Sequence, residues 1–245
     1  MPFVSVIFLL CSQTVYLLNE CIYSSELSSK NLIEHPELTI TRDFLEPMGV
    51  IPVIVVDDAS QAVPIVEALK AGGIKAVEVT LRTAAALDSI RKIKAECGDL
   101  LLGVGTVLNR QNLRDIANIG VDFVVSPGFT PDLIKHAQDA GLEILPGVSS
   151  PSEVMRGIEL GLSCFKLFPA VAVGGLSWLK SVAAPLPEVS FCPTGGLTID
   201  TFVEFLALPN VACVGGTWLV PKDAVKSKNW RLIQEIATLT TAKLT

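Results

Sequence analysis

Histidine is nearly absent from this sequence, and its cysteines form no close pairs. The two histidines, His35 and His136, are far apart in polar segments, so no spacing typical of a histidine metal site occurs. The six cysteines include no C-x-x-C pair. We therefore expect no catalytic metal. Free thiols in apolar, strand-like runs act as small hydrophobic side chains and indicate a reducing compartment, which favours the cytoplasm.

Positive charge is also scarce. Lysine and arginine together number 19 against 25 acidic residues, the formal net charge is −6, and no cluster of basic residues occurs. Nucleic-acid binding relies on a basic surface that pairs with the phosphate backbone. We therefore expect no nucleic-acid partner. A small anionic ligand needs only one or two cations, so this class of ligand remains open.

Long hydrophobic runs are missing as well, including at the N-terminus. Residues 3–10 are apolar, but polar residues within 12–19 interrupt the segment, and no basic residue precedes Lys30. This pattern is too short and too polar for a membrane span and lacks the basic start of a signal peptide. We predict no membrane attachment. Residues 1–35 are interpreted as an N-terminal extension of uncertain status, followed by a folded domain at 36–245.

Short apolar runs alternate with amphipathic stretches from residue 50 onward. Stretches such as 57–73 and 130–142 open with a capping residue and close near glycine, which indicates helices. Apolar strands separated by helices favour a parallel sheet covered by helices, and eight such units fit a (β/α)8 TIM barrel, an α/β fold. An open doubly wound sheet is the alternative, but no glycine-rich turn follows the first run. The eight runs are 50–56, 76–81, 101–107, 123–128, 142–148, 164–170, 189–196 and 211–218.

One lysine lies inside the sixth apolar run, where burying its charge is costly without a partner. Alternation with period two places Glu78, Thr80 and Arg82 on one face of the second run, and Lys166 and Phe168 on one face of the sixth. Residues of the second and sixth strands of a barrel can share one interior layer. Glu78 and Lys166 are therefore predicted to meet inside the barrel. A purely structural ion pair is the alternative that these residues leave open.

A buried lysine beside a carboxylate is also suited to nucleophilic catalysis. Burial disfavours the ammonium form, which leaves more free amine to attack a ketone. The resulting protonated imine accepts electrons when the adjacent carbon–carbon bond breaks, and the carboxylate can carry protons. The planar guanidinium of Arg82 suits an α-keto carboxylate. Glycine pairs at 195–196 and 215–216 end the last two runs, where barrels commonly bind phosphate, although tight turns also need glycine.

Seven motifs occur in order between Met48 and the C-terminal region: IPVIVV, EVTLRT, GVGTVLN, VSPGFT, FKLFPA, FCPTGG and GGTWLVP. Together they resemble the 2-keto-3-deoxy-6-phosphogluconate (KDPG) aldolase family, which also acts on 4-hydroxy-2-oxoglutarate. The resemblance implies a class I aldolase on a (β/α)8 barrel that needs no metal or cofactor. It implies cleavage of a phosphorylated 2-keto-3-deoxy sugar acid to pyruvate and glyceraldehyde 3-phosphate in the Entner–Doudoroff pathway, by a cytoplasmic homotrimer.

The resemblance also implies a role for each residue of the motifs. Lys166 corresponds to the Schiff-base lysine and Glu78 to the acid/base residue. The motif GGTW departs from the GGSW often found in the family, but Thr217 keeps the hydroxyl. The expected substrate contacts are Arg82 and Thr106 at the pyruvyl carboxylate, Pro127 and Phe168 as pocket walls, and Thr194, Gly195, Gly196, Gly215, Gly216 and Thr217 at the distal hydroxyls and phosphate.

Two other functions are compatible with the residues alone. Another barrel lyase or isomerase acting on a phosphosugar would share the glycine pairs but would not need a lysine in the sixth strand. A non-catalytic barrel that binds sugar phosphates would use Glu78 and Lys166 only as a structural pair. Removing either charge would then change stability more than ligand chemistry.

Overall fold

The structure, a computed structural model, describes residues 39–244. The extension predicted at 1–35, its boundary at residue 36, and the cysteines at 11 and 21 lie outside the described residues. Among the described residues, no helix has the length and apolar character needed to cross a membrane. The same residues include no group of three or more His, Cys, Asp or Glu side chains arranged to hold a metal ion.

The strands of the described part form two parallel sheets, which confirms the parallel α/β architecture predicted from the alternating runs. The larger sheet has the order β5-β4-β3-β2-β1-β9, and the smaller has the order β6-β7-β8. Each predicted run contains a strand, and the fifth contains two. The strands are β1 Val50–Ile54, β2 Ala76–Thr80, β3 Leu101–Gly105, β4 Phe123–Val125, β5 Ile144–Leu145, β6 Gly147–Val148, β7 Cys164–Leu167, β8 Ser190–Pro193 and β9 Val214–Gly216.

The two sheets are linked at both of their edges. Pro146 separates β5 from β6 because proline has no backbone N–H to donate to a ladder. The Pro146 carbonyl still accepts a hydrogen bond from the Lys166 N–H at 2.9 Å, so the chain passes from one sheet into the other. At the other edge, isolated parallel bridges join Phe191 to Val211 and Thr194 to Gly215, between the β8 and β9 segments.

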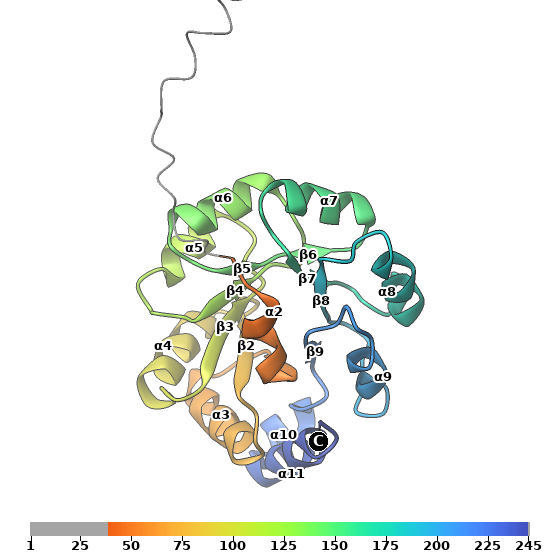
Figure 1. Ribbon diagram of the computed structural model, residues 1–245. Coiled ribbons are helices and arrows are strands. Elements are labelled where there is room, and N and C mark those ends of the chain that lie inside the picture. Colours follow the sequence, from red (N-terminus) through yellow and green to blue (C-terminus); the bar gives the residue numbers. More distant parts are fainter. Residues whose placement is uncertain (1–38, 245) are drawn as a thin grey trace, which may run out of the picture. The chain divides into compact units, whose positions relative to one another are not determined.

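Most of the helices surround the strands on the outside, as Figure 1 shows. The predicted helical stretches 57–73 and 130–142 contain α3 and α6, and the Thr130 side chain caps α6 by accepting a hydrogen bond from the Leu133 N–H. The helices are α2 Arg42–Leu45, η1 Glu46–Met48, η2 Ala59–Gln61, α3 Ala62–Ala71, α4 Ala86–Glu96, α5 Arg110–Ile116, α6 Pro131–Asp139, α7 Pro151–Glu159, α8 Gly175–Ala183, α9 Phe202–Leu206, α10 Lys222–Lys226 and α11 Trp230–Thr241.

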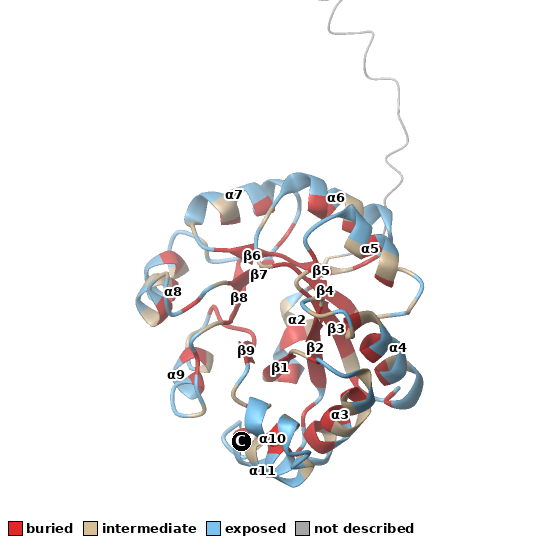
Figure 2. Cartoon of the chain, turned by 180° about the vertical axis from the view of Figure 1, so that it is seen from behind, coloured by how far each residue is buried: buried red, intermediate tan, exposed pale blue. Residues whose placement is uncertain are grey.

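Alternation along the strands creates two apolar layers, and Figure 2 shows how completely the strands are buried. On β2, Val77 and Val79 belong to the cluster packed with the helices, whereas Ala76 belongs to a second, inner cluster. The inner cluster also contains three cysteines, Cys164, Cys192 and Cys213, all free and buried. This confirms that these thiols act as hydrophobic side chains.

The segment before the first predicted strand also contributes to the inner cluster. Ile40, Leu45 and Met48 are buried there, and α2 lies over the centre of the strands in Figure 1. The Arg42 side chain fixes α2 by donating to the carbonyl oxygens of Pro209 at 2.6 Å and Val211 at 3.5 Å. The apolar runs predict repeating units that begin near residue 50 and no element before them. The inner layer is therefore completed by residues outside the eight units.

This arrangement predicts a sharp difference between two truncations. Deleting residues 1–30 should leave the fold intact, whereas deleting residues 1–48 should unfold the chain because it removes the inner side chains of α2 and η1. As a point test, Leu45→Ala should lower the free energy of unfolding by about 2–5 kcal/mol. The exposed neighbour Asp43, changed to alanine, should alter it by at most about 0.5 kcal/mol. Chemical denaturation monitored by circular dichroism measures the free energy of unfolding of both point variants. A stably folded chain that lacks residues 1–48 would contradict the expectation for the longer truncation.

Candidate active site

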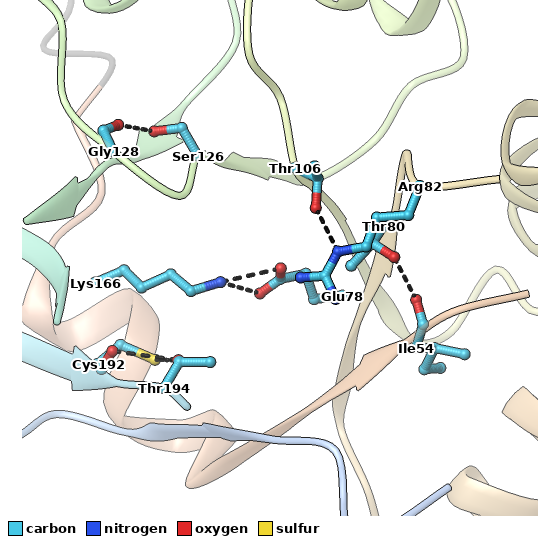
Figure 3. Close-up of polar contacts among 10 residues, drawn as sticks. All are labelled: Ile54, Glu78, Thr80, Arg82, Thr106, Ser126, Gly128, Lys166, Cys192 and Thr194. Carbon is cyan, nitrogen blue, oxygen red and sulfur yellow. Dashed lines mark hydrogen bonds and ion pairs between the residues drawn. The ribbon is translucent and has the colours of Figure 1, made fainter. Parts of the chain in front are cut away.

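Lys166 and Glu78 form an ion pair in the interior between the two sheets. Lys166 lies on β7 and Glu78 on β2, and the lysine Nζ donates to Glu78 Oε1 at 3.1 Å and Oε2 at 3.2 Å (Figure 3). Each residue is only 4% exposed. The structure thus brings together the two residues that strand alternation predicted to meet. Removing one partner of a buried pair leaves an uncompensated charge and costs about 3–5 kcal/mol.

The neighbours of Lys166 on β7 explain why its side chain points inward. Phe165 and Leu167 are fully buried in the cluster that packs with the helices, so the alternate residue faces the interior. The Nζ lies 5.4 Å from the centroid of the Phe168 ring, close enough for a cation–π contact. Phe168 follows the last residue of β7 and lies beside the ammonium group, and its role as a pocket wall stays a prediction.

A glycine on the neighbouring strand makes room for Glu78. A Cβ atom added at Gly105, on β3, would collide with the Glu78 carboxyl group. Glycine inside a strand often marks such a close approach of another group. The sequence motifs assign no role to Gly105, although its position in the apolar run LLGVGTV carries this signal. A larger residue at Gly105 would therefore displace the Glu78 carboxylate.

Arg82 and Thr106 lie together at the carboxyl ends of β2 and β3. The Arg82 Nε donates to the Thr106 hydroxyl at 3.1 Å, as Figure 3 shows. The prediction that Arg82 continues the strand is wrong, because β2 ends at Thr80 and Arg82 lies in the turn that follows. The Thr80 hydroxyl instead donates to the Ile54 carbonyl on β1 at 3.0 Å, which fixes the end of the strand below the turn.

Thr106 has an unusual backbone conformation. Its φ angle is 61°, in the left-handed region that a β-branched residue rarely adopts. Strain of this kind persists only where the surrounding structure fixes it, and it is concentrated at functional sites. Here the strained residue is the one that accepts the Arg82 hydrogen bond. The conformation is a second reason, independent of the sequence motif, to include this turn in the candidate site.

Pro127 reaches the site through the neighbouring strand. A Cβ atom at Gly147, on β6, would collide with the Pro127 backbone, so these two segments are in close contact. Gly147 is in turn the register partner of Lys166 on β7. Pro127 therefore lies one strand away from the lysine, and its role as a pocket wall stays a prediction.

The two glycine pairs lie side by side but need glycine for different reasons. Gly195 and Gly196, after β8, have φ angles of 102° and 88°, which strongly favour glycine. Gly215 and Gly216, on β9, are not among the positive-φ residues, and added Cβ atoms there would collide with the Thr194 hydroxyl and the Trp218 ring. Close packing therefore explains the second pair. Thr217, next to it, is exposed.

Burial keeps the thiol beneath the lysine neutral. Cys164 precedes Lys166 by two residues and shares its inward face, and burial raises the pKa of its thiol to about 11. The pKa of Cys213 is also raised, by a hydrogen bond with Cys192 and by burial. Both thiols are protonated at neutral pH. Glu78 is therefore the anion that faces the lysine.

Comparison with known proteins identifies the family. A family model described as "Aldolase: KDPG and KHG aldolase" matches residues 42–236. This chain belongs to that family. The resemblance found in the seven motifs is confirmed, and the match begins within α2, ahead of the first predicted strand.

Individual members of the family are similar over most of the chain. The KHG/KDPG aldolase of Escherichia coli (strain K12) is 45% identical over 199 residues, which are 81% of this chain and 93% of the relative. The crystal structure of KDPG aldolase from Legionella pneumophila, with pyruvate captured as a covalent carbinolamine, is 42% identical with a TM-score of 0.79 and covers 82% of this chain and 98% of its own. The crystal structure of the aldolase of Zymomonas mobilis ZM4 with 3-phosphoglycerate is 43% identical and has a TM-score of 0.76. It covers 82% of this chain and 95% of its own.

The strain at Thr106 predicts an uncoupling of stability from ligand affinity. Thr106→Gly should leave the free energy of unfolding within about 1 kcal/mol of the wild-type value, because relief of the left-handed strain offsets the added freedom of the unfolded chain. Binding of an α-keto acid such as pyruvate should weaken, because the hydroxyl beside Arg82 is lost. Thermal unfolding and the pyruvate concentration that half-saturates borohydride trapping measure the two effects.

The control for this variant is Thr238→Gly on the exposed face of α11. It should lower the free energy of unfolding by about 0.3 kcal/mol, because glycine is only slightly less favourable than threonine within a helix, and should leave pyruvate affinity unchanged. Unchanged pyruvate affinity in Thr106→Gly would show that Thr106 has no part in the site.

Proposed function

We propose that this chain acts as a class I aldolase in which Lys166 forms the Schiff base. It cleaves 2-dehydro-3-deoxy-6-phosphogluconate to pyruvate and glyceraldehyde 3-phosphate, and 4-hydroxy-2-oxoglutarate to pyruvate and glyoxylate. The observation that carries the proposal is the buried Lys166–Glu78 pair in a member of the KDPG and KHG aldolase family. The covalent carbinolamine captured in the Legionella pneumophila relative supports the same chemistry here.

The ion pair gives the lysine a way to become a nucleophile. Proton transfer from the Lys166 ammonium to Glu78, across 3.1 Å, leaves a neutral amine and a carboxylic acid. The amine attacks the C2 ketone of the substrate, and Glu78 returns its proton to the hydroxyl of the carbinolamine, which leaves as water. The product of this step is a protonated imine bonded to Lys166.

Glu78 then serves as the base for carbon–carbon cleavage. The carboxylate, through a water molecule, takes the proton of the C4 hydroxyl as the C3–C4 bond breaks, and the electron pair passes to the protonated imine to give an enamine. The aldehyde fragment departs. Glu78 protonates the enamine carbon, and hydrolysis of the imine releases pyruvate and restores the free lysine.

The remaining site residues bind the two anionic ends of the substrate. Arg82 and Thr106, joined by a hydrogen bond beside the pair, bind the pyruvyl carboxylate, while Pro127 and Phe168 form walls of the pocket. The phosphate and distal hydroxyls bind at the ends of β8 and β9, where backbone N–H groups and hydroxyls are donors. The residues assigned to this part are Thr194, Gly195, Gly196, Gly215, Gly216 and Thr217.

The proposal extends to the architecture and assembly. The passage of the chain through Pro146 and the bridges between the β8 and β9 segments support a closed (β/α)8 barrel spanning 36–245, preceded by an extension at 1–35. The family resemblance favours a cytoplasmic homotrimer in the Entner–Doudoroff pathway. Small molecules, namely the keto acid substrate and pyruvate, are its ligands.

Borohydride trapping tests the central step. Incubation with millimolar pyruvate and borohydride should add one reduced pyruvyl group per chain, and peptide mass spectrometry should locate it at Lys166. Lys166→Ala should abolish both trapping and turnover. Labelling at another lysine, or none in the wild-type protein, would refute the proposed mechanism.

Replacing Glu78 by glutamine separates the proton carrier from the nucleophile. Glu78→Gln keeps the shape and one hydrogen bond but removes acid/base catalysis, so turnover should fall about 10²- to 10⁴-fold. Trapping of pyruvate should slow yet remain detectable, whereas exchange of the pyruvate methyl protons with deuterated water should fall much further, since exchange requires deprotonation of the imine. Nuclear magnetic resonance measures this exchange. Wild-type exchange in the variant would leave Glu78 as only an ion-pair partner.

A further inference from the structure

The proposed phosphate loops at the ends of β8 and β9 are joined by an aromatic contact outside the site. The ring of Trp218, just after Thr217, stacks on the ring of Phe202, with the centroids 5.4 Å apart and the planes at 28°. Phe202 begins α9, the helix that follows the Gly195–Gly196 turn. The stack therefore connects the segment after one glycine pair to the segment after the other.

The Trp218 ring is also fixed on its other sides. It packs so closely against Gly216 that a Cβ atom there would overlap its six-membered ring. Its Nε1 donates to the hydroxyl of Thr240 on α11 at 3.3 Å. Thr240 is fully buried and donates in turn to the Ile236 carbonyl at 2.8 Å. The indole is thus held between the β9 backbone, α9 and α11.

The chain between the Gly195–Gly196 turn and Phe202 is short and internally bonded. The Thr198 N–H donates to the Thr201 hydroxyl at 3.1 Å, and the Phe202 N–H donates to the Thr198 carbonyl at 3.0 Å. These hydrogen bonds tie Phe202 to Thr198, which follows the Gly195–Gly196 turn by two residues.

We infer that Trp218 is a positioning residue for the distal phosphate of the substrate, through its contacts with Gly216 and Phe202. This inference rests on the proposed function. Anion recognition by backbone N–H groups depends on their spacing and direction, since such groups cannot reorient as a flexible side chain can. Trp218 sets that spacing from the outer face of β9. It touches no reacting atom, and the Lys166–Glu78 pair lies on other strands.

A substrate without a phosphate separates this role from a general structural one. Trp218→Leu, which removes the stack and the indole N–H, should raise KM for 2-dehydro-3-deoxy-6-phosphogluconate about ten- to a hundredfold, as displaced binding groups do. KM for 4-hydroxy-2-oxoglutarate should stay within about twofold, and borohydride trapping with pyruvate should be unchanged. Trp218→Phe keeps a stacking ring and should raise KM for the phosphorylated substrate by a smaller factor. Thr240→Val should raise KM for the phosphorylated substrate only.

The matched control is Trp178→Phe. Trp178 is another half-buried tryptophan with an aromatic partner, Phe191, at 5.3 Å, but it lies on α8 and its contact does not join the two glycine loops. Trp178→Phe should leave the KM values of both substrates unchanged, even where it lowers the melting temperature.

The outcomes distinguish the inference from the function on which it rests. With an active wild-type protein, an equal rise of both KM values, or no rise for the phosphorylated substrate in any Trp218 or Thr240 variant, overturns the positioning role. If Trp218→Leu fails to fold, Trp218→Phe and Thr240→Val decide. A wild-type protein that traps no pyruvate and cleaves neither substrate overturns the proposed function and this inference with it.

Discussion

The buried ion pair between Lys166 and Glu78 is the interaction on which the site depends. It joins β7 of the smaller sheet to β2 of the larger one, at 3.1 Å and away from water. Two charges in such a place are stable only together, so the sheets must hold them at a fixed separation. The links through Pro146 at one edge and through the Thr194–Gly215 bridge at the other provide that constraint.

The remaining features around the pair keep its chemistry specific. Gly105 gives the carboxylate its space, and the protonated thiols of Cys164 and Cys213 fill the layer beneath it without adding negative charge. A second anion near Lys166 would stabilise the ammonium form and oppose the loss of its proton. The phosphate end of the proposed substrate is assigned to neutral donors on β8 and β9. Lys166 therefore faces the Glu78 carboxylate, and in the proposed reaction the phosphate of the substrate binds away from this pair.

The parts that could be predicted from the sequence are those set by local periodicity. Each apolar run contains a strand, and period-two alternation together with the layered interior of a barrel was sufficient to predict that Glu78 and Lys166 meet. Side-chain direction in a strand depends on neighbours in sequence. Features set by distant contacts were missed. The four residues of α2 are too few for a periodic signal, and Arg42 holds them by carbonyl groups far along the chain. The reason for glycine at Gly216 is likewise visible only once the Trp218 ring is placed beside it.

The buried position of the lysine has a consequence for the order of events. Lys166 is only 4% exposed and pairs with Glu78 on the facing strand. In the proposed reaction the pyruvyl fragment is bonded to this lysine, whereas no covalent bond holds the aldehyde fragment once the C3–C4 bond has broken. The aldehyde therefore departs before pyruvate, which is freed only when water hydrolyses the imine. The order of product release then follows from where the covalent bond lies and requires no moving segment.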